Sequence, residues 1–167
     1  YFYKKKKYYF LKKKITRDIN IFIDIGAHHG DTIIDFLRIF SIKKIYAFEP
    51  SKKNFDKLKA TVKKIEKYNS VKIKIYPVGT GEKNDILTLN EITDGVSNTF
   101  NSLNQDSKYF KKKKFFTTLF GIKKFINDKV PTKIIALKEL IKEEKIDKID
   151  FIKIDTEGFE FNTLLGL

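Results

Sequence analysis

The feature that most constrains the fold is a short apolar run that ends in an acid and is followed by two glycines. The sequence runs Ile-Phe-Ile-Asp-Ile-Gly-Ala-His-His-Gly from Ile21 to Gly30, and an amphipathic segment begins directly after it. This pattern predicts a strand, a tight turn and a helix. In that arrangement a Gly-rich loop admits a nucleotide-like ligand close to the backbone at a helix N-terminus. We therefore expect the function to depend on what this loop binds.

Strand and helix patterns alternate along the chain. Short apolar or alternating runs predict strands at residues 19–25, 45–49, 71–76, 86–89, 133–135 and 149–155. Apolar residues at helical spacing predict helices around residues 31–40, 55–65, 137–141 and 159–165. This alternation favours a parallel sheet with right-handed crossovers. The third strand has one polar face and is expected at or near a sheet edge.

Three other stretches are less regular. Residues 79–85 and the polar residues 91–107 are expected to be loops, and a loop as long as the second is usually functional or disordered. The aromatic residues 109–127 suggest a helix interrupted by Gly121, either a buried segment or a lid over a substrate. Residues 1–18 are interpreted as a basic N-terminal extension and residues 19–167 as one domain.

Composition limits the partners. The net charge of +14 raises the possibility of a nucleic-acid or membrane-surface partner. The lysines, however, are spread over the whole chain, so compositional bias explains the charge better, and we disfavour a nucleic-acid partner. Cysteine is absent, which excludes disulfides and thiolate sites and fits a cytoplasmic protein. No stretch is long and apolar enough to predict a transmembrane segment.

Three of the predicted strands end in an acid, namely Asp24, Glu49 and Asp155. In an open parallel sheet, ligands bind outside the carboxyl ends of the strands, so we expect these carboxylates to face one crevice. Glu49 lies roughly 20 residues past the Gly loop, where an acid accepts hydrogen bonds from both ribose hydroxyls of a nucleoside.

The glycine spacing indicates which kind of nucleoside the loop binds. Asp24-x-Gly26-x-x-x-Gly30 differs from the dinucleotide pattern G-x-G-x-x-G and from the phosphate loop G-x-x-x-x-G-K-[ST]. The loop carries an acid rather than a lysine, which suits a cationic amino-acid end better than a pyrophosphate. S-adenosyl-L-methionine, which has ribose, adenine, sulfonium and ammonium groups, is such a ligand.

Three segments resemble the FkbM family of class I S-adenosylmethionine-dependent methyltransferases. They are residues 22–32, residues 47–50, and residues 150–160 with Leu-Leu-Gly at 164–166. Residues 71–81 and 130–140 match more loosely, so the resemblance covers most of residues 20–167. The first segment alone indicates only a class I methyltransferase. The sequence Lys-Ile-Asp-x-Glu-Gly-x-Glu that begins at Lys153 is what makes the resemblance specific.

The resemblance implies an α/β, Rossmann-like three-layer sandwich with a mostly parallel sheet. It implies cofactor-binding residues at Asp24, Gly26, Ala27, His28, Gly30, Glu49, Val78 and Gly79. Of these, Val78 and Gly79 would lie near the adenine. His28 is a departure, since the family commonly has Asn there. We expect one residue of the pair His28–His29 to hydrogen-bond in the loop and the other to face solvent.

The resemblance also implies methyl transfer to a hydroxyl oxygen of a small-molecule or glycan acceptor, often a sugar or secondary metabolite. Asp155 and Glu157 would line the cavity where methyl donor and acceptor meet. Because transfer requires an aligned acceptor that loses its proton, either carboxylate is a candidate general base or acceptor-orienting group. A divalent cation at these carboxylates is a less favoured alternative, as is a purely structural role in which Glu157 caps the last helix.

Two other interpretations stay open. A methyltransferase acting on nucleic-acid bases would explain the charge, but such enzymes usually carry an Asn/Asp-Pro-Pro-Tyr/Phe segment where this chain has Asp-Thr-Glu-Gly at 155–158. The second interpretation is a catalytically inactive fragment with a Rossmann-like fold. The family's sheet continues with at least one more strand, so a chain ending at Leu167 is expected to be incomplete on its C-terminal side.

Overall fold

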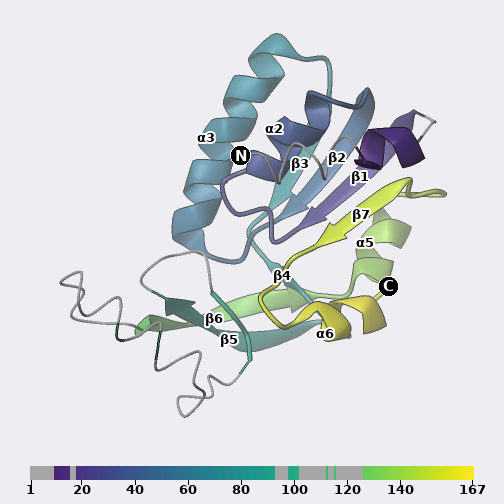
Figure 1. Ribbon diagram of the computed structural model, residues 1–167. Coiled ribbons are helices and arrows are strands. Elements are labelled where there is room, and N and C mark those ends of the chain that lie inside the picture. Colours follow the sequence, from purple (N-terminus) through teal and green to yellow (C-terminus); the bar gives the residue numbers. More distant parts are fainter. Residues whose placement is uncertain (1–9, 16–17, 93–97, 102–111, 113–114, 116–125) are drawn as a thin grey trace.

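The computed structural model describes residues 10–15, 18–92, 98–101, 112, 115 and 126–167. Its main sheet has four parallel strands in the order β3-β2-β1-β7 (Figure 1). They are β1 (Ile19–Ile25), β2 (Ile42–Phe48), β3 (Lys72–Tyr76) and β7 (Phe151–Ile154). The predicted parallel sheet is confirmed, and β3 lies at its edge as its alternating pattern indicated.

Helices cover both faces of this sheet. On one face lie α2 (Asp31–Leu37) and α3 (Lys52–Tyr68), and on the other lies α5 (Leu137–Glu143). Side chains of β2 alternate between the two, because Ile45 and Ala47 pack toward α2 and α3 whereas Tyr46 and Phe48 pack toward α5. The arrangement is the expected three-layer α/β sandwich.

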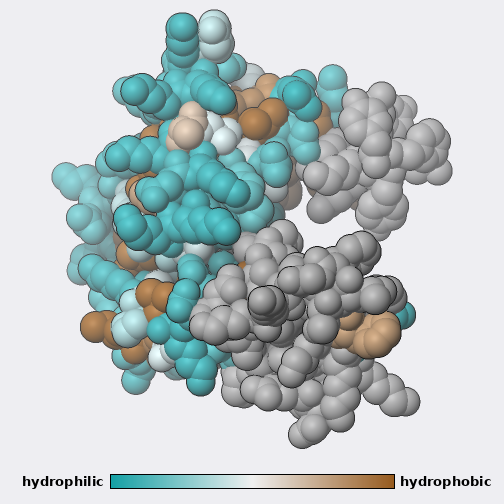
Figure 2. Space-filling model, turned by 90° about the vertical axis from the view of Figure 1, so that its left-hand side faces the viewer, coloured by the Kyte–Doolittle hydropathy of each residue, from teal (hydrophilic) through white to brown (hydrophobic). Residues whose placement is uncertain are grey.

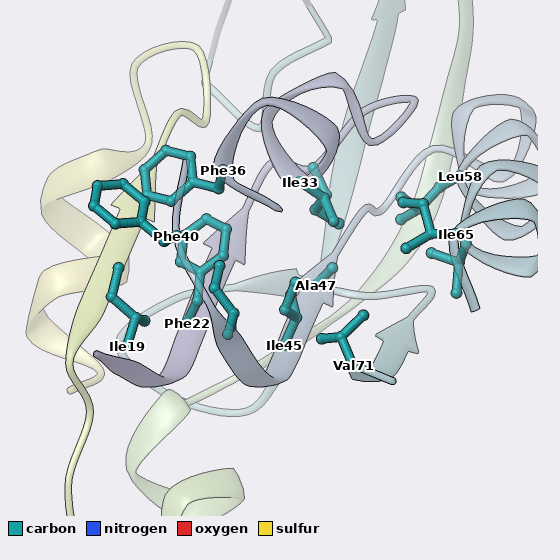
Figure 3. Close-up of a cluster of buried hydrophobic side chains, with 13 residues drawn as sticks. Ile19, Phe22, Ile33, Phe36, Phe40, Ile45, Ala47, Leu58, Ile65 and Val71 are labelled. Carbon is teal, nitrogen blue, oxygen red and sulfur yellow. The ribbon is translucent and has the colours of Figure 1, made fainter. Parts of the chain in front are cut away.

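Aromatic rings fill the core beneath α2 (Figure 3). The ring of Phe22 stacks on that of Phe36 with centroids 4.6 Å apart, and Phe151 packs edge-on against Phe22. Leu11 and Ile15 also pack against this cluster. The described part of the basic N-terminal segment therefore contributes apolar contacts to the domain.

A second, smaller sheet is a correction to the sequence analysis. It contains β4 (Gly79–Thr80), β5 (Asp85–Ile92) and β6 (Ile126–Ile135) in the order β4-β6-β5. Residues 79–85 were expected to be a loop, yet Gly79 and Thr80 pair with Ile134 and Ile135. A two-residue strand is too short to show a periodicity, so only the pairing reveals it.

The same sheet changes the bounds predicted nearby. The strand expected at 133–135 already begins at Ile126, which was expected to be helical, because it pairs with β5 from Ile126 to Ile134. Glu91 and Ile92, expected in a loop, belong to β5, and Asn90 forms a bridge with Thr99. The remainder of the loop and helix expected at 91–107 and 109–127 lies largely outside the described residues.

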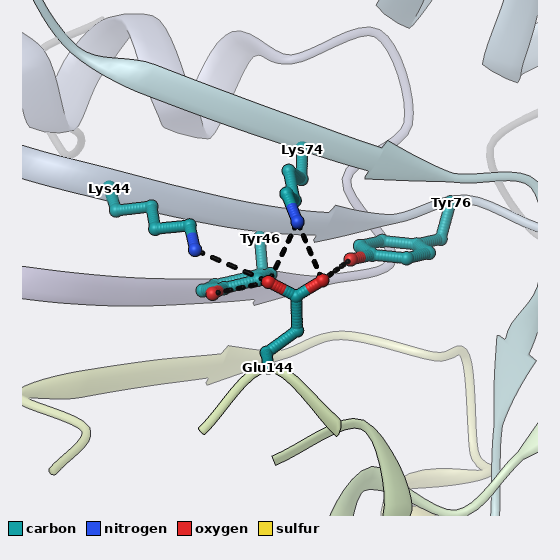
Figure 4. A network of polar contacts seen from close by, with 5 residues as sticks. All are labelled: Lys44, Tyr46, Lys74, Tyr76 and Glu144. Carbon is teal, nitrogen blue, oxygen red and sulfur yellow. Dashed lines mark hydrogen bonds and ion pairs between the residues drawn. The ribbon is translucent and has the colours of Figure 1, made fainter. Parts of the chain in front are cut away.

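Polar contacts hold two helices against neighbouring strands. The carboxylate of Glu144, directly after α5, accepts hydrogen bonds from Lys74 Nζ at 2.7 Å, Tyr46 Oη at 3.1 Å and Tyr76 Oη at 3.2 Å, and Lys44 Nζ lies 3.3 Å away (Figure 4). Hydrogen bonding to Lys74 is the main cause that lowers the pKa of Glu144 to about 2. The last helix, α6 (Glu160–Leu165), meets β4 of the small sheet through Thr163 Oγ1 and Thr80 Oγ1, 3.0 Å apart.

In the described part of the chain, no helix combines the length and the hydropathy that crossing a membrane requires.

Candidate cofactor and catalytic site

A cavity of about 300 Å³ lies at the carboxyl ends of β1, β2 and β7. Eight of the residues predicted for the site line it, namely Gly26, Ala27, His28, Glu49, Val78, Gly79, Asp155 and Glu157. The other two predicted residues do not line it, since Asp24 is fully buried behind the loop and Gly30 begins α2. Glu49 and Asp155 thus face one crevice as expected, whereas the expectation was wrong for Asp24, because its side chain is buried between the strands.

The loop after β1 needs its glycines for two different reasons. Gly26 and Gly30 have φ angles of 72° and 89°, in the left-handed region. A Cβ atom on Gly26 would lie 1.9 Å from the carbonyl oxygen of Asp155, so the loop approaches β7 backbone to backbone. The amides of Gly26 and Ala27 both donate to the carbonyl oxygen of Phe48, which ties the loop to β2 as well.

His28 also has a left-handed backbone, with φ of 51°. Asn tolerates this conformation better than most residues, which gives a physical reason for the Asn that the family commonly has at this position. The rings of His28 and His29 stack with centroids 3.6 Å apart, and His29 Nε2 lies 3.2 Å from Asn54 Oδ1. The expectation that one histidine faces solvent is wrong, because both are half-buried.

Glu49 is held at the end of β2 by backbone amides. Its Oε2 accepts a hydrogen bond from the His28 amide at 2.8 Å, and its Oε1 accepts one from the Ser51 amide at 3.0 Å. Burial raises the pKa of Glu49, and these hydrogen bonds oppose part of that rise. The carboxylate is thus oriented before any ligand arrives, at the wall of the cavity.

The turn that carries Asp155 and Glu157 is strained and braced. Glu157 and Gly158 have φ angles of 52° and 99°. Glu160 Oε1 accepts hydrogen bonds from the amides of Thr156 and Gly158 at 2.9 and 3.1 Å. Burial of Glu160 opposes its ionisation, but hydrogen bonds from its own backbone amide and from these two amides prevail and lower its pKa. The carboxylate that caps this turn is therefore that of Glu160.

The loop after β5 braces the turn from the other side. Thr99 Oγ1 donates to the carbonyl oxygen of Glu157 at 2.8 Å, and Asn101 Nδ2 donates to that of Gly158 at 2.7 Å. Asn98 and Phe100 line the cavity. The sequence predicted only a long loop of the kind that is usually functional or disordered, and it had no signal for these particular contacts, which depend on the tertiary fold.

Lys153 is the main residue that sequence reasoning missed. It is the first residue of the motif that makes the family resemblance specific, but no role was predicted for it. It lines the cavity, and its Nζ lies 3.2 Å from Asp24 Oδ1 and 3.7 Å from Asp155 Oδ2. A lysine two residues before the acid at the end of an apolar strand was the available signal, because such a cation needs a partner.

The cavity is acidic although the chain is basic. Its described lining contains the carboxylates of Asp31, Glu49, Asp155 and Glu157, against the single ammonium of Lys153. Such a lining favours a ligand that carries positive charge. Across the described residues, no group of three or more His, Cys, Asp or Glu side chains is arranged to hold a metal ion.

Comparison with known proteins agrees with this geometry. The FkbM methyltransferase domain matches residues 24–167. The fold is similar to the crystal structure of a methyltransferase FkbM from Methylobacillus flagellatus KT, with a TM-score of 0.56 and 16% identity, over 89% of this chain and 28% of that one. A second match is the YcgJ protein from Bacillus subtilis, with a TM-score of 0.32 and 14% identity, over 41% of this chain and 29% of that one.

The chain therefore spans less than a third of the length of either solved structure. A search of curated proteins found no match. The family match extends over most of the chain and includes the cavity-lining loops after β1, β2 and β7. The chain belongs to the FkbM methyltransferase domain family.

Proposed function

We propose that this methyltransferase domain binds S-adenosyl-L-methionine and directs its methyl group to a hydroxyl oxygen of a small-molecule or glycan acceptor. The observation that carries the proposal is the pairing of Glu49 with the loop after β1, since the His28 amide fixes a buried carboxylate at the cavity wall. A carboxylate at this place in a Rossmann-like sheet suits two ribose hydroxyls.

The residues around the cavity fit the chemical groups of this cofactor. Glu49 would hold the ribose, the loop Gly26–Gly30 the amino-acid end, and Val78 and Gly79 the adenine side. The acidic lining suits the sulfonium and ammonium charges. When bound, S-adenosylmethionine supplies an electrophilic methyl group.

Asp155 and Glu157 are the proposed catalytic residues. The side chain of Asp155 is 65% exposed, so it is open to a ligand in the cavity that it lines. One of the two carboxylates accepts the proton of the acceptor hydroxyl or orients that hydroxyl for in-line attack. The bracing of this turn by Thr99, Asn101 and Glu160 supports such a positioning role.

The alternative of a nucleic-acid substrate has the net charge in its favour. The exposed lysines of α3 form part of a hydrophilic surface on the side of the molecule shown in Figure 2. A phosphate backbone near the acidic cavity would be repelled, however. The charge pattern therefore favours an acceptor without phosphates at the site itself.

Methyl transfer from radiolabelled S-adenosylmethionine to a panel of monosaccharides, glycans and hydroxylated small molecules tests the proposal. We expect label in at least one hydroxylated acceptor, a loss of turnover of about 100-fold or more in Asp155→Asn or Glu157→Gln, and no loss in the matched control Asp56→Asn on the exposed side of α3. Unchanged turnover in both site variants contradicts the catalytic assignment.

A further inference from the structure

Lys153 lies at the centre of the contacts that join β1, β7 and the cavity. Its ammonium donates hydrogen bonds to the carbonyl oxygens of Gly26 at 2.7 Å and Ile25 at 3.3 Å. The carboxylates of Asp24 and Asp155 lie 3.2 and 3.7 Å away. An ammonium has three N–H donors, and two of them are used by these carbonyl oxygens. Its contacts to the two carboxylates are ion pairs.

The partner of Lys153 on β1 is a fully buried acid. Asp24 and Lys153 are opposite one another in the register of β1 and β7, and the side chain of Asp24 is fully buried. A buried carboxylate without a cation is strongly destabilising, whereas a neutral pair in its place is often tolerated. Burial raises the pKa of Asp24, and the charge of Lys153 opposes that rise. One task of Lys153 is thus to neutralise Asp24.

The other contacts of Lys153 do not contribute to the neutralisation of Asp24. Gly26 is the first residue of the cofactor loop, and it touches the backbone of Asp155 so closely that no Cβ fits between them. The Asp155 amide donates to the carbonyl oxygen of Ile25 at 3.1 Å. Lys153 adds a bond to the loop carbonyl and a charge contact to the Asp155 side chain, so it spans this junction.

We propose that Lys153 is a positioning residue for methyl transfer, which fixes the Gly26 carbonyl of the cofactor loop and the Asp155 carboxylate relative to each other. The functional meaning of this position rests on the proposed function, since both partners belong to the proposed cofactor and catalytic site. The structural part of the inference, that Lys153 orders the junction of loop and turn, can be measured without any ligand.

The test separates neutralisation of Asp24 from positioning. Lys153→Met leaves the buried Asp24 without its cation, while Asp24→Asn/Lys153→Met removes both ionisable groups. Lys63→Met is the matched control, because Lys63 lies on the exposed side of α3. The readouts are the thermal unfolding midpoint, amide hydrogen exchange of residues 25–30 and 155–158, and the Kd for S-adenosylmethionine from calorimetry.

We expect Lys153→Met to lower the unfolding midpoint and the double variant to regain most of it. In the double variant, amide exchange at the two segments stays faster than in the wild type, and the Kd for S-adenosylmethionine rises about tenfold, the effect of losing one charge-assisted hydrogen bond. Lys63→Met changes none of these.

A double variant with wild-type exchange and wild-type Kd overturns the positioning role and leaves Lys153 as the counter-charge of Asp24 alone. A double variant that does not fold contradicts the division into two tasks. If the wild type itself binds no S-adenosylmethionine, the proposed function fails, and the exchange data alone still decide whether Lys153 orders the junction.

Discussion

The amide of His28 donates a hydrogen bond of 2.8 Å to Glu49 Oε2, and this contact joins the loop after β1 to the end of β2. It links two of the three segments that carry the family resemblance, residues 22–32 and 47–50. Because the His28 backbone is left-handed, the amide and the carboxylate meet only when the loop adopts its strained form. The loop and Glu49, the proposed ribose-binding acid, therefore form one preorganised unit.

The affinity for S-adenosylmethionine is expected to depend on the ionisation of Glu49. Burial raises its pKa above 4.5, so the carboxylate takes up a proton at a higher pH than an exposed glutamate does. As the pH falls through this raised value, affinity should fall by about tenfold per pH unit, because a protonated acid accepts fewer hydrogen bonds. Calorimetry across a pH series measures this.

The matched comparison is Glu49→Gln, which cannot titrate. It should bind weakly and with little pH dependence over the same range. A wild-type affinity that stays constant down to pH 4.5 would contradict the role of the Glu49 carboxylate.

Gly26→Ala and Gly30→Ala form a matched pair, because both residues have positive φ angles. At Gly30 the new Cβ meets only side-chain atoms of Leu58 and Thr61, at 3.1 Å, so we expect a loss of about 1–2 kcal/mol from backbone strain. At Gly26 it meets the Asp155 carbonyl, and the loss should be larger by about 1–3 kcal/mol. Urea unfolding measures both, and equal losses would contradict the backbone contact between loop and turn.

Glu144→Gln should destabilise the fold by about 1–3 kcal/mol, because it removes a charged acceptor shared by two lysines and two tyrosines. The pKa of Glu144 is lowered from 4.5 to about 2, so its stabilisation is complete above pH 4.5 and is lost as the pH falls toward 2. The exposed neighbour Glu143→Gln is the control, with an effect near zero. Parallel acid-unfolding curves for Glu144→Gln and the wild type would argue against the network.

Any nucleic-acid binding should be weak, and it should not involve the proposed cofactor site. Charge reversal at exposed α3 lysines, Lys57→Glu and Lys64→Glu, is expected to reduce any salt-dependent binding of an RNA oligonucleotide while the affinity for S-adenosylmethionine stays unchanged. Fluorescence anisotropy at several salt concentrations measures the former. Tight, salt-dependent RNA binding that competes with the cofactor would favour a base-modifying enzyme instead.

The sequence was informative about elements whose patterns are local. The burial of β1 and β2 on both faces and the amphipathic α3 follow from periodicity, and the acids at the ends of the strands follow from the rule for parallel sheets. Glu49 could be predicted as a site residue because an acid at the end of the second strand is typical of ribose binding in such a sheet.

The small sheet and the role of Lys153 could not be predicted in the same way. Pro131 lies inside β6, where a proline usually argues against a central strand, but β4 pairs with β6 only at Ile134 and Ile135. Lys153 meets Asp24 only because β7 lies beside β1. Such contacts join distant parts of the chain, since the hydrogen bond from Lys153 to the Ile25 carbonyl oxygen spans 128 positions of the sequence. Both features depend on strand order, which periodicity does not encode.

Calorimetric titration of the wild-type chain with S-adenosyl-L-methionine tests the central claim most directly, with Glu49→Ala and the exposed control Glu66→Ala beside it. The account predicts one-to-one binding by the wild type and by Glu66→Ala, and a loss of at least about tenfold in Glu49→Ala, which removes the proposed ribose acceptor. A folded wild-type chain that gives no binding heat and no shift in its unfolding midpoint with the cofactor would contradict it, as would a Glu49→Ala variant that binds as tightly as the wild type.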